Sequence, residues 1–127
     1  MNEKIEAVKM FHEAFGLNVN TKPTAEIGED TINLRYKLME EENNEYLKAA
    51  REKDMVEIAD ALGDMLYVLM GTIIEHGLQD KIEEVFEEIQ ASNMSKLGED
   101  GKPIYRKDGK VLKGKNYFEP NIAAILK

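Results

Sequence analysis

The sequence has no cysteine, no tryptophan and only three prolines among 127 residues. Without cysteine, disulfide frameworks, thiolate metal sites and a cysteine nucleophile are excluded, so any metal must bind through oxygen or imidazole ligands. Long apolar runs are also missing, because Asp60 and Asp64 interrupt the most apolar stretch, residues 58 to 74, and no apolar signal core opens the chain. We therefore expect a cytoplasmic protein that does not enter a membrane.

Positive charge is scarce overall, and the formal net charge is -8. Binding to duplex nucleic acid needs clustered lysine and arginine, so we expect no nucleic-acid partner. The charge is unevenly distributed, because residues 1–92 carry 9 Lys or Arg against 21 Asp or Glu, whereas residues 93–127 carry 8 against 4. The sequence predicts an acidic body with a basic tail.

The length is typical of one domain, and we assign residues 1–127 to a single domain with a helical body, 1–97, and an irregular tail, 98–127. Apolar residues recur at helical spacing through most of the body. The fold class is therefore all-α, a bundle of about four main helices. The expected helices cover residues 3–15, 29–51, 58–74 and 79–97.

The third expected helix has the clearest boundaries. Asp54 is placed as its N-cap with Glu57 at the capping-box position, and the helix should end at His76-Gly77. Its sequence is apolar on nearly every side, which a small monomer cannot cover, so we expect a homodimer or homotetramer. Gly63 and Gly71 within it suggest close approach by another helix or a ligand.

The tail differs from the body in composition, because its glycine and proline residues interrupt the helical periodicity of apolar residues. Residues 104–106 and 110–112 flank a Lys-Asp-Gly turn at 107–109, a pattern typical of a short hairpin.

Carboxylates recur at a spacing that suits metal binding. Glu42 and Glu45 lie three residues apart on the second helix, and Glu57 and Asp60 have the same spacing on the third. Residues three apart lie on one helix face, and Asp64 extends the second pair by a further turn. Two facing helices would then bring four or five carboxylates to one place.

Clustered carboxylates repel one another, and a divalent cation removes that repulsion. Carboxylate oxygens suit Mg²⁺, with Mn²⁺ as a second choice, and such ions retain positions for substrate phosphates. A nucleoside triphosphate or a similar polyphosphate is the natural ligand. A calcium buffer is a weak alternative, because no EF-hand loop is present.

These motifs resemble the all-α nucleoside triphosphate pyrophosphohydrolases, which include MazG, phosphoribosyl-ATP pyrophosphohydrolase and the helical dUTPases. Their pattern is E-E-x-x-E followed by E-x-x-D, and the sequence looks most like the MazG-like, dUTPase-related branch. The matching blocks are Phe11–Gly16, Glu41–Glu45, Glu57–Asp60, Asp64–Val68, Ser92–Lys96 and Asp108–Lys113.

The resemblance implies hydrolysis between the α and β phosphates, which gives a nucleoside monophosphate and pyrophosphate, as in nucleotide-pool sanitation. It implies Mg²⁺ on Glu42, Glu45, Glu57 and Asp60, with Glu41 orienting or deprotonating the attacking water.

Further residues are candidates for binding the substrate, and two histidines are assigned no catalytic role. Asn93 and Lys96 fall in a block that the resemblance places near the substrate, although an ordinary helix end is the alternative. Tyr67 is a candidate for base stacking or for the core. His12 and His76 lie in or at the end of helices. The full candidate set for substrate binding is Asn93, Lys96, Asp64, Tyr67, Lys110 and Lys113.

Two other functions stay open. One is phosphoribosyl-ATP pyrophosphohydrolase of histidine biosynthesis, which shares the acidic motifs. The other is a metal-stabilised helical interaction module that performs no chemistry. Nothing in the sequence specifies the nucleobase.

Overall fold

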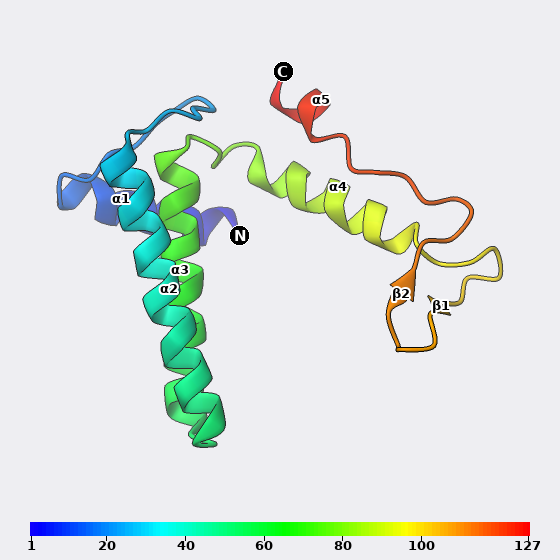
Figure 1. Ribbon diagram of the computed structural model, residues 1–127. Helices are drawn as coiled ribbons and strands as arrows, with labels where there is room; N and C mark the ends of the chain where they lie inside the picture. The colour runs from blue at the N-terminus through cyan, green and yellow to red at the C-terminus, as the bar shows by residue number, and fades with distance from the viewer. The chain divides into compact units, whose positions relative to one another are not determined.

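A computed structural model describes all 127 residues, which form two compact units, Met1–Asp80 and Lys81–Lys127. The structure contains five helices and one two-stranded hairpin, so the predicted all-α class is confirmed (Figure 1). The boundary between the units falls before the fourth helix, whereas the sequence suggested one body extending to residue 97.

The first unit begins with helix α1, Asn2–Ala14, as periodicity predicted. It ends at the expected glycine, because Gly16 adopts a φ of 72° and the Leu17 N–H donates to the His12 carbonyl. The buried face of α1 includes Ile5 and Val8, and it packs against α3.

Helices α2, Glu29–Arg51, and α3, Met55–Glu75, form the antiparallel pair seen in cyan and green in Figure 1. The connection is only three residues long, and Lys53 takes a left-handed conformation there with a φ of 58°. Asp54 caps α3 by accepting a hydrogen bond from the Glu57 N–H, as predicted. The other half of the predicted capping box is not formed, because the Asp54 N–H donates instead to the carbonyl of Ala49.

A buried polar layer joins the three helices of this unit. Arg35 of α2 donates to the Thr72 hydroxyl at 3.0 Å and to the Val68 carbonyl at 2.9 Å. His12 and Glu75 are both buried, with 3.8 Å between the His12 Nδ1 and a Glu75 carboxylate oxygen. Desolvation lowers the pKa of Arg35, and the charge of Glu75 acts in the opposite direction.

This layer explains one of the two helical glycines. A Cβ on Gly71 would lie 2.5 Å from an Arg35 guanidinium nitrogen and 2.9 Å from the His12 Nε2, so the predicted close approach is confirmed there. A Cβ on Gly63 would meet no atom within 4 Å, so the single chain offers no such reason for Gly63.

The second unit contains α4, the predicted hairpin and a helix that sequence periodicity missed. Helix α4 spans Ile82–Met94 and is shorter than the expected 79–97. At its start, the side chain of Gln79 donates to the carbonyl of Asn20, and at its end the carbonyl of Lys96 accepts from the N–H of Gly114. The Gln79 side chain and the Lys96 carbonyl thus bond to segments outside this helix.

The hairpin pairs β1, Ile104–Tyr105, with β2, Val111–Leu112, in antiparallel register, which confirms the prediction. Gly109 supplies the positive φ of 89° that the turn requires. Helix α5, Ile122–Leu126, follows, with Asn121 accepting the Ala124 N–H as its cap.

Few large apolar side chains are fully removed from solvent. The buried apolar residues are Ile5, Val8, Ala49, Ala61, Met70 and Ile74.

No helix in the structure combines the length and apolarity needed to span a bilayer.

Candidate metal centre

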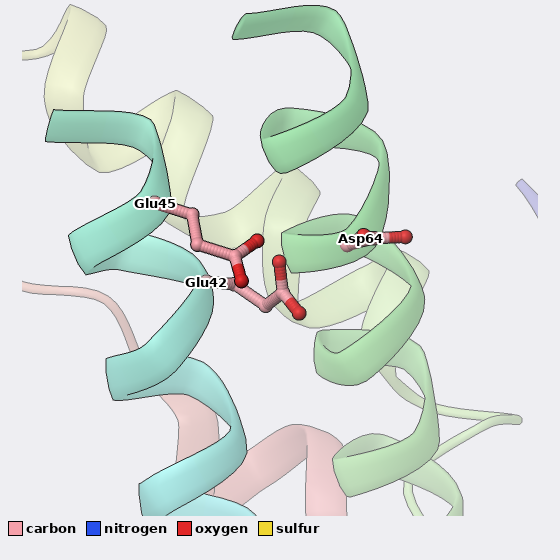
Figure 2. A group of neighbouring side chains, drawn as sticks. All are labelled: Glu42, Glu45 and Asp64. Atoms are coloured by element: carbon pink, nitrogen blue, oxygen red, sulfur yellow. The ribbon is translucent and has the colours of Figure 1, made fainter. Parts of the chain in front are cut away.

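Three carboxylates meet between the two long helices of the first unit. Glu42 and Glu45 reach from α2 towards α3, which contributes Asp64 (Figure 2). One oxygen from each of the three lies within 4.8 Å of the other two. The two glutamates come from the predicted E-E-x-x-E motif, so the predicted convergence of carboxylates from both helices is confirmed for these residues.

The antiparallel pairing of α2 and α3 determines which acidic residues meet. Arg35 bonds to residues 68 and 72 of α3, so residues whose numbers sum to between about 103 and 107 lie opposite one another. Glu42 therefore faces Asp64, and the charge of Asp60, one turn earlier on α3, also acts on Glu42. The sequence could not supply this pairing, because no local pattern encodes it.

The electrostatics of the cluster centre on Glu42. Its pKa is raised to about 7, first by desolvation, then by a hydrogen bond with Glu45 and by the charges of Glu45, Asp64 and Asp60. Its Oε2 atom is buried and has no hydrogen-bond partner. An unpaired buried carboxylate oxygen among other carboxylates is unfavourable unless a proton or a cation binds there.

The donor set fits a hard divalent cation. All three side chains offer carboxylate oxygens, without sulfur or imidazole, and this chemistry suits Mg²⁺ or Mn²⁺. The unpartnered Glu42 Oε2 is an oxygen that such an ion would satisfy.

The remaining predicted carboxylates take different places. The charge of Asp60 acts on Glu42, so Asp60 lies at the edge of the cluster. Glu57 lies in the first turn of α3, is exposed, and is not among the three converging groups. Glu41 is also exposed and precedes Glu42 on α2. Asp64, assigned to the substrate from the sequence, is the third member of the cluster.

The predicted substrate-binding residues are divided between the two units. Tyr67 of α3 contacts Phe11 of α1 edge to face, with 5.7 Å between the ring centroids, and keeps 43% of its surface exposed. The others lie in the second unit, where the Lys113 ammonium sits 4.7 Å from the centre of the Tyr117 ring and the Lys110 N–H donates to Asp108. The four in this unit are Asn93, Lys96, Lys110 and Lys113.

Arg35 was not predicted from the sequence, yet it bonds α2 to α3 and lines a cavity between them. A single arginine in the stretch from Leu34 to Met39 gives no motif. The only available signal was that a cation interrupts the apolar stripe of that helix.

Residues 8–93 match the family model described as phosphoribosyl-ATP pyrophosphohydrolase. The chain belongs to this family. The matched segment includes both acidic motifs and all three converging carboxylates.

Two individual proteins extend the comparison. Over 69 residues, the chain is 39% identical to an uncharacterized protein, L479, of Acanthamoeba polyphaga mimivirus, a match that covers 52% of this chain and 28% of that protein. Among solved structures, the crystal structure of a protein described as a "putative NTP pyrophosphohydrolase" from Exiguobacterium sp. 255-15 has 28% identity and a TM-score of 0.51. That match covers 96% of this chain and 92% of the other.

Proposed function

We propose that this protein is a Mg²⁺-dependent pyrophosphohydrolase that cleaves a ribo- or deoxyribonucleoside triphosphate between the α and β phosphates. The products are a nucleoside monophosphate and pyrophosphate. The convergence of Glu42, Glu45 and Asp64 around an unpartnered carboxylate oxygen, in a chain of this family, carries the proposal.

In this proposal Glu42, Glu45, Asp60 and Asp64 hold the ion, with Glu57 contributing from the first turn of α3. A Mg²⁺ ion bound to carboxylates neutralises phosphate charge and lowers the pKa of bound water. Glu41 lies beside Glu42 on the solvent-exposed side of α2. We assign it the role of orienting the attacking water and accepting its proton.

Four of the predicted substrate-binding residues belong to the second unit and have side chains suited to phosphate or nucleotide groups. Lys96, Lys110 and Lys113 are cations able to donate to phosphate oxygens, and Asn93 is able to donate or accept through its amide. In the first unit, Tyr67 of α3 offers an aromatic ring for stacking, although Phe11 already contacts it. These roles rest on residue chemistry and on the family resemblance.

The substrate within the triphosphate class is a separate choice. Nucleotide-pool sanitation fits an enzyme that acts on free nucleoside triphosphates. Phosphoribosyl-ATP is the second candidate, because the matching family model carries its name. Both substrates contain the same phosphoanhydride bond, so the carboxylate cluster serves either reaction.

The first experiment measures pyrophosphate release with Mg²⁺ from canonical and modified nucleoside triphosphates and from phosphoribosyl-ATP. Wild type is compared with Glu45→Ala and with Glu84→Ala, an exposed acidic residue on α4. We expect the wild type to turn over at least one of these substrates. Glu45→Ala should reduce turnover at least about 100-fold, because it removes a ligand and charge partner of the ion. Glu84→Ala should leave turnover unchanged. Mg²⁺ binding without turnover on any substrate would favour the non-catalytic helical module.

We further propose that the protein self-associates as a homodimer or homotetramer through the α3 stripe, defined here as Met55, Leu62 and Leu66. Leu62 and Leu66 are 48% and 46% exposed in the single chain, although they belong to its most apolar helix. A second copy of this helix offers the matching apolar surface.

Light scattering coupled to size-exclusion chromatography tests this association. Wild type should elute as a dimer or tetramer, Leu66→Glu should shift towards the monomer, and Val111→Glu in the exposed hairpin should not. A monomeric wild type would refute self-association. A Leu66→Glu variant with the same molar mass in solution as the wild type would refute the role of the α3 stripe in it.

A further inference from the structure

A cavity of about 300 Å³ opens between α2 and α3, beside the carboxylate cluster. Its nearest walls are Met39, three residues before Glu42 on α2, and Leu69, five residues after Asp64 on α3. Because the helices are antiparallel, Met39 and Leu69 lie on the same side of the carboxylates. At roughly 1.5 Å of rise per residue, the cavity begins about one helical turn from the carboxylates.

The walls of the cavity are mainly apolar, with one aromatic ring. Ile32, Met39 and Leu69 line it together with Tyr36. The Tyr36 hydroxyl donates to Glu40 at 3.3 Å, and 65% of the tyrosine surface is exposed. A volume near 300 Å³ and walls of this kind suit a small, flat organic group rather than a phosphate chain.

Polar groups in the lining provide both donors and an acceptor. Arg35 uses two of its five N–H donors on Thr72 and Val68, and the others have no partner in the protein. The His76 Nδ1 lies 2.8 Å from the Thr24 carbonyl, which only accepts, so Nδ1 carries the hydrogen. In the neutral ring the His76 Nε2 is then an acceptor. Donors and an acceptor beside apolar walls match the edge and faces of a nucleobase.

We infer that this cavity binds the base and sugar of the nucleotide, with its phosphates directed to Glu42 and Glu45. The inference rests on the proposed function and deepens it, because it assigns base selection to the groove between α2 and α3. Tyr36 stacks on the base, while Arg35 and His76 contact its polar edge. The second unit is then not required for base selection.

The first test needs no catalysis. Saturation-transfer NMR with uridine, cytidine, adenosine and guanosine, each without metal, reports binding of the nucleoside alone. We expect at least one nucleoside to bind the wild type, and Leu69→Trp, whose ring fills the cavity, to abolish that signal. Glu45→Gln should preserve it, because this residue lies outside the cavity. Circular dichroism verifies that each variant is helical.

The second test uses Tyr36→Ala, at an exposed position that tolerates truncation, with Phe86→Ala as an exposed aromatic control outside the cavity. Loss of one base-aromatic stack should raise KM by about 5- to 100-fold and reduce the differences in KM among nucleotides that carry different bases. Tyr36→Phe keeps the ring and should restore the wild-type KM, while Phe86→Ala should leave it unchanged.

The two proposals fail separately. Pyrophosphate release by the wild type, with no nucleoside signal and an unchanged KM in Tyr36→Ala, would overturn the nucleoside pocket and leave the enzymatic function standing. Nucleoside binding that Leu69→Trp abolishes, without turnover of any triphosphate, would overturn the enzymatic function and retain the pocket. A nucleoside signal that survives in Leu69→Trp would place the base elsewhere.

Discussion

The protonation of Glu42 predicts how pH and Mg²⁺ together control stability. Without metal, the pKa of Glu42 is about 7 in the folded protein, against 4.5 for an ordinary glutamate. The folded state therefore binds the proton more tightly, and this contribution to stability is fully present below pH 4.5 and is lost as pH rises to about 7. The full shift corresponds to roughly 3.4 kcal/mol, which partial solvent exposure reduces to about 1–2 kcal/mol.

Magnesium should reverse this loss, because it binds the ionised carboxylate. At pH 5.5 the proton competes with the metal and weakens its binding about 30-fold relative to pH 8, since the pKa lies about 1.5 units above that pH. We therefore expect 10 mM Mg²⁺ to raise the melting temperature by several degrees at pH 8 and hardly at all at pH 5.5. Differential scanning fluorimetry with and without Mg²⁺ measures the effect.

Two variants separate this site from general screening of the acidic surface. Glu42→Gln should make the rise in melting temperature with Mg²⁺ the same at pH 5.5 and pH 8, because the titrating group is gone. Glu6→Gln replaces an exposed acidic residue on α1 and should leave the pH dependence of that rise unchanged. Equal stabilisation by Mg²⁺ at both pH values, or an unchanged response in Glu42→Gln, would show that Glu42 does not bind the ion.

Four further substitutions test the packing by urea unfolding. Gly71→Ala should lower the free energy of unfolding by about 1–3 kcal/mol, because its methyl group would displace the guanidinium of Arg35, whereas Gly63→Ala on the same helix should raise it by about 1 kcal/mol. Lys53→Gly should stabilise by about 1 kcal/mol, since a left-handed conformation is unfavourable for lysine, and an unchanged value would refute strain there. Asp54→Ala should cost about 1 kcal/mol by removing the N-cap of α3, and no loss would show the cap to be dispensable.

Local signals made the first unit predictable. Helix α2 begins and ends at the expected residues, and α3 has its cap at Asp54, because periodicity, capping residues and glycines act within a few residues of one another. Helix α4 was predicted too long, since the side-chain bond of Gln79 and the backbone bond of Lys96 involve distant segments. Helix α5 was missed because five residues are too few to show a helical period.

The candidate site was predictable in its residue types but not in its membership. The spacing of Glu42 and Glu45 placed both on one face of α2, which is a local property. Asp64 joined them because of the pairing between two helices, a non-local property set by distant contacts. The cavity that begins at Met39 could not be predicted from the sequence either, because its walls come from both helices.

The buried polar layer explains why the carboxylates meet where they do. Arg35 donates to Val68 and Thr72, and the absence of a side chain on Gly71 leaves space for its guanidinium. Sliding α2 by one turn would move each carboxylate about 5.4 Å along the groove. The same slide would break both Arg35 bonds and separate that cation from buried Glu75, which is strongly destabilising for a charge removed from water. The polar layer therefore favours one pairing of α2 and α3, and that pairing places Glu42 opposite Asp64.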